Sequence, residues 1–435
     1  MAASELIALD QPQQADLDRC VHCGLCLNAC PTYRELRVEM DSPRGRIYQM
    51  AQVSSGAAAI SPSYIQHIDL CLACRGCETA CPSGVRYGRL VEAARAEIEN
   101  HIQRPRHIRW LRSFFFRKLL PSRVNLGILG TMLYLYQASG LKWLVRVLGF
   151  LPSRLREIES LAPDIEAPFF FPYYGKILPA EGQRRHRVAF LGGCIANLAF
   201  ARLNESTVRV LQKNGCEVSI PKDQTCCGAL HVHSGLPEEA RKLARRNIDA
   251  LLDGGFDAII TNAGGCGSTL KEYGELLEHD PAYAEKAHRF AAVVKDVNEF
   301  LASIELNTNM SAQPLIATYQ DSCHLAHGQK IRSAPRKLLS LVPGLELREM
   351  PLSDLCCGSA GIYNVVHTSM STALLRKKMD AVKATGAQMI VTANPGCMLQ
   401  LEAGARKFGQ GQRVAHVVEI LDQAYLAAQE PKRTS

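Results

Sequence analysis

Two short runs of cysteine constrain this 435-residue chain more than any other feature. Each run has the spacing C-x2-C-x2-C-x3-C followed by proline. Eight of the seventeen cysteines belong to these runs, which contain Cys20, Cys23, Cys26 and Cys30 in the first copy and Cys71, Cys74, Cys77 and Cys81 in the second. Three closely spaced thiolates can bind three corners of one cube, so this spacing is typical of 4Fe–4S clusters. The sequence therefore predicts two such clusters.

The fourth cysteine of each run is expected to bind the cluster of the other run. It starts the next turn of chain, beyond the cube that the first three thiolates hold, and the proline after it ends the local helix. The predicted ligand sets are thus crossed: Cys20, Cys23, Cys26 and Cys81 for one cluster, and Cys71, Cys74, Cys77 and Cys30 for the other. Zinc and disulfides are the alternatives. One zinc site needs four ligands, and two identical sets of four cysteines are more than one site requires. Disulfides need an oxidising compartment.

The composition fits a soluble globular protein of several domains, with 47% hydrophobic and 21% charged residues. The first ten residues have neither a basic segment nor an apolar core, so they do not read as a secretory signal. Many cysteines without export indicate thiols kept reduced, and we expect a cytoplasmic protein.

Residues 104–150 concentrate much of the net charge of +8. Aromatic residues alternate there with basic ones, which are Arg104, Arg106, Arg109, Arg112, Arg117, Lys118 and Arg123. Such a segment could make peripheral contact with an anionic membrane, dock onto another subunit, or form a solvated helix face. The uncharged stretch Val124–Leu141 is interrupted by Gly, Asn, Gln and Ser, so it makes a poor membrane span. No nucleic-acid partner is expected, because no nucleic-acid module is present.

The sequence from residue 186 onward repeats itself. Apolar strand-like runs alternate with helical stretches, and matching cysteines recur at offsets of 129, 130 and 131 residues. The prolines Pro163, Pro168, Pro172 and Pro179 mark a linker before the repeat. The predicted fold class is α + α/β: a helical two-cluster module (1–100), a helical insert and linker (101–185), and two α/β domains (186–305 and 306–430) that form a pseudo-symmetric pair.

Each repeat contributes four cysteines from predicted strand ends and loops. The candidate sets are Cys194, Cys226, Cys227 and Cys266 in the first copy, and Cys323, Cys356, Cys357 and Cys397 in the second. Ligands of open α/β sheets gather at the carboxyl ends of strands, so each set could hold a further iron–sulfur cluster or a zinc ion. Cys216 lies outside the repeat and is interpreted as a buried structural thiol.

The repeats resemble the cysteine-rich CCG domain of heterodisulfide reductase B subunits and of several flavoprotein-oxidase iron–sulfur subunits. The resemblance rests on Cys226-Cys227-Gly228 and Cys356-Cys357-Gly358. The family's final C-x-x-C is incomplete, since Ala263 and Asn394 stand at its first position. Each copy is therefore one thiolate short of the five-cysteine site. A four-cysteine cluster, a zinc ion and an empty thiol site all remain open.

The order of modules resembles the iron–sulfur subunits of bacterial glycolate oxidases. The runs Pro31–Glu35, Asp41–Tyr48 and Asn262–Ser268 strengthen the resemblance. It implies an electron-transfer subunit that serves FAD-binding partners in a hetero-oligomer, relays electrons toward a membrane quinone, and lies on the cytoplasmic face of the inner membrane. The chain has no G-x-G-x-x-G after a strand, so the resemblance places FAD and glycolate oxidation on the partners. Alternatives are a lactate or glycerol-3-phosphate dehydrogenase subunit, or a heterodisulfide-reductase-like thiol enzyme.

Histidines and arginines near the cysteines are mostly expected to be ordinary. His231, His233, His324 and His327 follow cysteine motifs, and only His324, in Asp321-Ser-Cys-His324, resembles a family position. Arg44, Arg46 and Arg75 could tune a cluster by charge, but plain surface arginine is the preferred interpretation.

Overall fold

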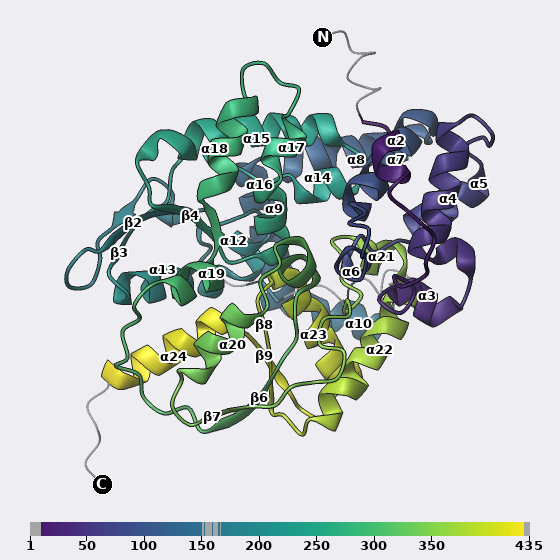
Figure 1. Cartoon of the computed structure of the whole chain (residues 1–435). Helices are drawn as coiled ribbons and strands as arrows, with labels where there is room; N and C mark the ends of the chain where they lie inside the picture. Colours follow the sequence, from purple (N-terminus) through teal and green to yellow (C-terminus); the bar gives the residue numbers. More distant parts are fainter. Residues whose placement is uncertain (1–9, 150–151, 153–158, 160–163, 166, 430–435) are drawn as a thin grey trace.

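The structure is a computed structural model that describes residues 10–149, 152, 159, 164–165 and 167–429 (Figure 1). Parts of four predicted features lie outside this range: residues 1–9 of the first module, residue 150 of the basic segment 104–150, residues 151, 153–158, 160–163 and 166 of the linker, which include Pro163, and residue 430 of the last domain.

Short helices joined by cysteine loops form the N-terminal module, drawn in purple and blue in Figure 1. The helices are α2 (Gln14–Leu17), α3 (Pro31–Leu36), α4 (Pro43–Ser54), α5 (Pro62–Asp69), α6 (Gly76–Thr79) and α7 (Tyr87–His101), with a 3-10 turn η1 (Glu39–Asp41). Proline occupies the first turn of α3, α4 and α5, where no amide hydrogen bond is lost. Ser42 and Ser61 cap α4 and α5 by accepting from Gly45 N and Tyr64 N. Buried Met50, Ile68 and Leu90 join these helices into one small core.

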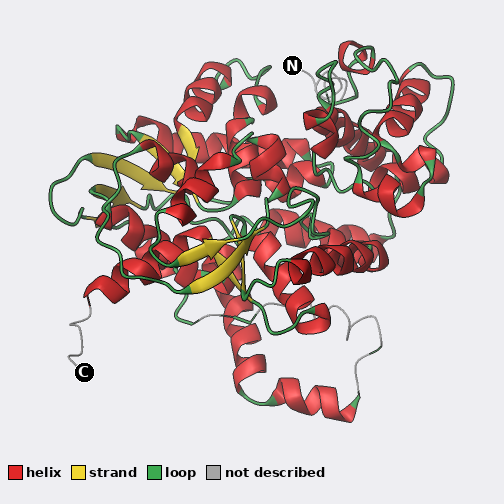
Figure 2. Cartoon of the chain, turned by 60° about the horizontal axis from the view of Figure 1, so that its bottom comes forward, coloured by secondary structure: helices red, strands yellow, loops and turns green. Residues whose placement is uncertain are grey.

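The insert is a run of helices between the N-terminal module and the first repeat. It contains α8 (Arg106–Ser113), the π-helix η2 (Phe114–Leu119), α9 (Arg123–Ala138) and α10 (Leu141–Leu148). Gly127 and Gly130 let α9 approach Phe171 and Leu198 closely. Figure 2 shows α9 and α10 projecting from the body, next to the grey trace that follows α10. None of the helices in the described ranges has the length and apolar content needed to cross a bilayer.

The first repeat is a five-stranded sheet in the order β1-β3-β2-β4-β5. Its strands are β1 (Ile177–Leu178), β2 (His186–Phe190), β3 (Cys216–Ser219), β4 (Ala258–Thr261) and β5 (Val294–Asp296). All pairs are parallel except β1 with β3. The sheet is accompanied by α12 (Ala196–Ala199), α13 (Ala201–Lys213), α14 (Ala229–His233), α15 (Pro237–Leu251), η4 (Leu252–Gly254), α16 (Gly264–Lys271), α17 (Tyr273–Leu276), α18 (Ala284–Val293) and α19 (Val297–Ser303), and η3 (Phe171–Tyr173) precedes it. Strand β4 is buried along its whole length, as expected for a parallel strand covered on both faces.

The second repeat is a four-stranded parallel sheet in the order β7-β6-β8-β9. Its strands are β6 (Leu315–Tyr319), β7 (Leu345–Leu347), β8 (Met389–Thr392) and β9 (Arg413–His416). The π-helix η5 (His324–Gly328) and the helices α20 (Ser333–Ser340), α21 (Tyr363–Val366), α22 (Thr368–Ala384), α23 (Pro395–Phe408) and α24 (Val417–Gln429) accompany them. The order matches β3-β2-β4-β5 of the first repeat. The predicted α + α/β fold with two repeated domains is thus confirmed.

The two repeats share one hydrophobic core. Val188 and Phe190 of the first sheet belong to the same buried cluster as Tyr319 and Val391 of the second. The loops that follow β4 and β8 also meet, because Gly264 N donates to Ala393 O at 3.3 Å. The carboxyl ends of both central strands therefore face each other.

Candidate metal centres

The first crossed quartet surrounds one small cavity. Cys20, Cys23, Cys26 and Cys81 all line it. The backbone turns sharply between the first three thiols, because His22 and Gly24 have φ of 54° and 83°. Burial raises the pKa of Cys26 to about 11. A metal that binds there must displace a proton.

The second crossed quartet surrounds a neighbouring cavity. Cys30, Cys71, Cys74 and Cys77 line it. Cys77 also lines the first cavity, so the two sites share a wall. Two donors contact one of the four sulfurs: Ala73 N lies 3.3 Å from Cys71 Sγ, and Tyr87 Oη lies 3.6 Å from it. Hydrogen bonds to sulfur favour the anionic thiolate that an iron atom requires. The residues at both cavities thus fit a 4Fe–4S cube.

Two arginines beside these cavities are not surface residues, and the preferred interpretation is wrong for them. Arg46 is 0% exposed and Arg75 is 8% exposed. Arg46 bonds to Asp41, Thr32 and His67. Arg75 pairs with Glu272, almost two hundred positions further along the chain. Only Arg44 keeps a partly exposed side chain.

Each repeat brings its four cysteines together at the carboxyl edge of its sheet. In the first copy the thiols of Cys194, Cys226, Cys227 and Cys266 are successive neighbours, in that order. Cys194 follows β2, the Cys-Cys pair follows β3, and Cys266 lies in α16 after β4. Gly228, with φ of 87°, packs against Ala240 of α15, where a side chain would be strained.

The second copy has the same arrangement with Cys323, Cys356, Cys357 and Cys397. Asn394, at the position of the missing fifth cysteine, donates Nδ2 to Cys397 Sγ at 3.4 Å. Hydrogen bonds, first from Cys356 and then from Cys397, hold the pKa of Cys357 well below its usual range. In the described part of the chain, no group of three or more His, Cys, Asp or Glu side chains is arranged to hold a metal ion. A cube differs from a single ion, since each thiolate binds a separate iron.

A buried lysine distinguishes the second copy, and sequence reasoning missed it. Lys378 of α22 is 4% exposed and donates Nζ to Leu352 O at 2.7 Å and to Ser353 O at 3.1 Å. Its charge lowers the pKa of Cys357. The matching position of the first copy is Asn247, which bonds Cys226 O instead. The only signal in the sequence is a cation within an otherwise apolar stripe of a helix.

The N-terminal module packs directly against the second copy's thiols. Leu72 belongs to one buried cluster with Cys323 and Cys356, and Cys74 packs against that cluster. Burial raises the pKa of Cys74, and the sulfur of Cys323 raises it further. Tyr363 Oη also donates to Leu70 O at 3.0 Å. The second crossed quartet and the second-copy quartet are therefore neighbours.

The histidines after the cysteine motifs mostly fasten modules to one another. His231 bonds Phe116 O at 2.8 Å, and His327 bonds Thr79 Oγ1 at 2.8 Å. His233 bonds Glu92 at 2.9 Å and stacks on His324, with ring centroids 5.0 Å apart. Burial lowers the pKa of His324 to about 3, so this ring is neutral. Cys216 is fully buried in β3.

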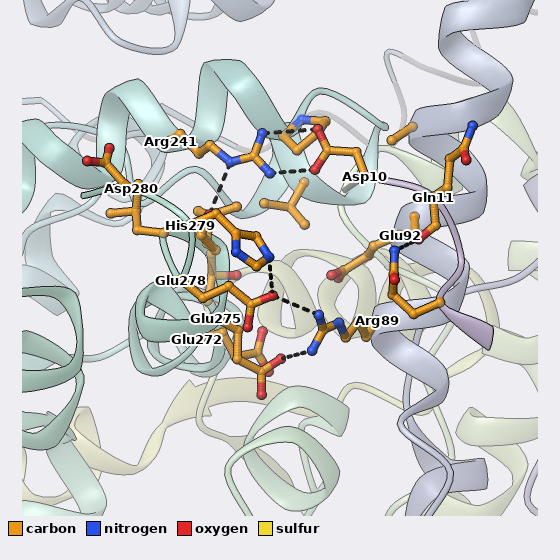
Figure 3. A pocket seen from close by; sticks show the side chains of 18 of the residues that line it. Asp10, Gln11, Arg89, Glu92, Arg241, Glu272, Glu275, Glu278, His279 and Asp280 are labelled. Atoms are coloured by element: carbon orange, nitrogen blue, oxygen red, sulfur yellow. Dashed lines mark hydrogen bonds and ion pairs between the residues drawn. The ribbon is translucent and has the colours of Figure 1, made fainter. Parts of the chain in front are cut away.

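A separate pocket of about 560 Å³ lies between α7 and the helices α15 and α17 (Figure 3). No cysteine lines it. Its charged side chains pair with one another: Arg89 with Glu278 at 2.9 Å, Arg245 with Asp280 at 2.7 Å, and Arg241 with Asp10. This pocket was not predicted from the sequence, because its two walls come from different modules.

Comparison with known proteins matches each module. The protein-family model described as "4Fe-4S dicluster domain" matches residues 16–85. The family model described as "Cysteine-rich domain" matches residues 188–271 and 317–402. "Glycolate oxidase iron-sulfur subunit, linker region" matches residues 107–162. The fold and its cysteine sites define an electron-transfer iron–sulfur subunit.

Relatives match along almost the whole chain. The "Probable glycolate oxidase iron-sulfur subunit" of Bacillus subtilis is 41% identical over 95% of both chains. The "Glycolate oxidase iron-sulfur subunit" of Escherichia coli is 36% identical over 94% of both. "Lactate utilization protein A 2" of Bacillus mycoides is 31% identical over 54% of this chain and 98% of its own. The chain belongs to the family of glycolate oxidase iron–sulfur subunits.

Proposed function

We propose that this chain accepts electrons from FAD-binding partner subunits that oxidise glycolate to glyoxylate, and passes them toward a membrane quinone. The observation that supports the proposal best is the continuity of its thiol sets. Two crossed quartets share a wall at Cys77, and the second of them adjoins the thiols of the second copy. A series of neighbouring sites is what one-electron transfer over a distance requires.

The chemistry divides between this chain and its partners. Oxidation of glycolate to glyoxylate releases two electrons and two protons, which a flavin can accept together. When bound, a 4Fe–4S cube takes up and releases one electron at a time. This chain's residues hold the cubes by eight thiolates, donate hydrogen bonds to sulfur from Ala73 N and Tyr87, and exclude water through the core around Met50 and Leu90.

The same proposal assigns a further iron–sulfur cluster, rather than zinc, to the cysteine-rich repeats. Four thiols per copy lie in contact at the strand ends, and three of the second copy's four have neighbours or charges that perturb their pKa values. Metal analysis decides the point. About eight irons per chain limit the clusters to the N-terminal module, more iron places a cluster in the repeats, and zinc contradicts the assignment.

The test of the function is anaerobic co-purification of the full chain with its native partners. We expect a complex that contains flavin, iron and acid-labile sulfide and that reduces a quinone analogue with glycolate. A complex active only with lactate or glycerol 3-phosphate would refute the substrate assignment, and a complex without flavin would refute the relay.

A further inference from the structure

The outer face of helix α9 is apolar. Val124, Ile128, Met132 and Leu135 form one stripe and are 72%, 57%, 64% and 57% exposed. The opposite face, with buried Leu126 and Gly130, packs on the body. In water such a stripe loses the stabilisation of burial, about 1.5–3 kcal/mol for each large side chain. It therefore indicates a surface that something apolar covers.

Helix α10 also exposes large apolar side chains. Its two basic residues, Lys142 and Arg146, pair with acidic residues of the segment that follows, Asp164 at 3.2 Å and Glu159 at 2.8 Å. Trp143 and Val147 are 67% and 61% exposed. The basic residues of α10 are thus paired within the chain, and its large apolar side chains are left exposed. An ordinary surface helix buries its apolar side chains instead.

The far half of α9 exposes four consecutive apolar or aromatic side chains. Met132, Leu133, Tyr134 and Leu135 are consecutive, and all are exposed. Consecutive side chains of a helix point about 100° apart, so these four cover the whole circumference. A groove on a protein covers one face of a helix, and the exposed apolar surface here is wider than one face. Its width favours a lipid surface over a groove on a protein partner.

The charge of the region fits an anionic lipid surface. Residues 104–149 contain nine Lys and Arg residues and no Asp or Glu. Arg106, Arg109 and Lys118 are exposed and form no ion pair with any residue that the structure describes. Each basic residue near an anionic surface adds about 1 kcal/mol of attraction. Both tryptophans of the protein, Trp110 and Trp143, also lie in this segment and are exposed.

We propose that the arm formed by α9 and α10 (Arg123–Leu148) docks this protein onto the surface of an anionic bilayer. The arm lies in the interface and does not cross the membrane, with Trp143 and the α9 stripe among the headgroups and upper acyl chains. The interaction is independent of the cysteine sites. Membrane binding can be lost while the iron content stays intact, and iron can be lost while membrane binding stays intact.

Vesicle flotation of the full, iron-loaded chain tests this proposal. We expect the protein to float with vesicles of equal parts phosphatidylglycerol and phosphatidylethanolamine, and to bind pure phosphatidylcholine much more weakly. Trp143→Glu or Ile128→Glu should weaken binding at least about tenfold, because each removes one buried apolar side chain from the lipid. Ile177→Glu, at a strand residue of matching exposure (58%), should leave binding unchanged.

Fluorescence locates the contact. Trp110→Phe leaves Trp143 as the sole tryptophan, and brominated lipid should then quench its emission. Absence of flotation, or equal losses in the α10 and Ile177 variants, would overturn the proposal. It would also be overturned if the α9 and α10 variants bound vesicles normally but no longer retained a flavin-containing partner, since the arm would then be a protein interface.

Discussion

Replacing Arg46 with methionine should destabilise the N-terminal module far more than the same replacement at Arg44. The two arginines lie two positions apart at the start of α4 and both pair with an acid. The Arg46 side chain is 1% exposed and its partner Asp41 is 6% exposed. For Arg44 and Glu39 the values are 30% and 47%. The two replacements therefore compare the loss of a buried ion pair with the loss of an exposed one, at positions in the same helix.

The magnitude follows from what each change leaves behind. Without Arg46, the Asp41 carboxylate stays buried and keeps its contact with the His67 ring, whose Nδ1 lies 2.9 Å away. The carbonyl of His67 also loses its 2.7 Å hydrogen bond from Arg46 Nε. Removing one partner of a buried ion pair costs about 3–5 kcal/mol, and the contact with His67 favours the lower end. An exposed pair such as Arg44–Glu39 contributes about 0–1 kcal/mol.

Native-state hydrogen exchange measures this loss within the module. Peptides that cover α4 and α5 should lose about a hundredfold or more of their protection in Arg46→Met, since each 1.4 kcal/mol is a factor of ten. Arg44→Met should lose less than about tenfold. The double variant Arg46→Met with Asp41→Asn should recover part of the loss, because no carboxylate is then left unpaired. Equal losses at both arginines, or no recovery in the double variant, would refute the reasoning.

Three further predictions concern the ligands, the shared core and pH. Cys30→Ser should perturb the paramagnetic signal of the cluster held by the second run, and Cys81→Ser that of the first; uncrossed losses would contradict the ligand sets. Arg209→Ala leaves Asp422 buried without its 2.6 Å partner, so urea unfolding should show a loss of about 2 kcal/mol, and an unchanged midpoint would count against it. Burial raises the pKa of Asp296 from 3.8 to about 6, so the folded state holds this proton more tightly and stability falls, by up to about 3 kcal/mol, as pH rises through that interval. Asp296→Asn should flatten stability measured between about pH 4 and 6, and an unchanged slope would assign the pH effect to another group.

Local features of the sequence were sufficient for the strands and the cysteine motifs. The apolar run Ala258–Thr261 predicts a buried strand because a parallel strand needs apolar side chains on both faces. The runs around Cys20 and Cys71 predict cluster loops because cluster ligation fixes the spacing. In both cases the determining interactions lie within a few residues, so the pattern is visible in one stretch of chain.

Burial of charge could not be predicted, because it depends on partners far away in the chain. Arg75 is next to Cys74 in sequence, but its partner Glu272 belongs to the first repeat. The exposure of the arm is similar, because an apolar stretch of helix is normally buried and only the structure shows that Trp143 and Val147 of α10 are exposed.

The relation between the two repeats also lies beyond the sequence, and it bears on the path of electrons. Both copies have the same four-cysteine pattern, so the motif alone makes them equivalent. The structure makes them unequal, because Leu72 and Cys74 pack with Cys323 and Cys356 of the second copy. The second copy also has Lys378 where the first has Asn247, and a buried cation favours an added negative charge. The proximity of the N-terminal module and the charge of Lys378 thus both favour electron transfer to the second copy. Within the proposed relay, an electron that leaves the second crossed quartet meets the second copy before the first.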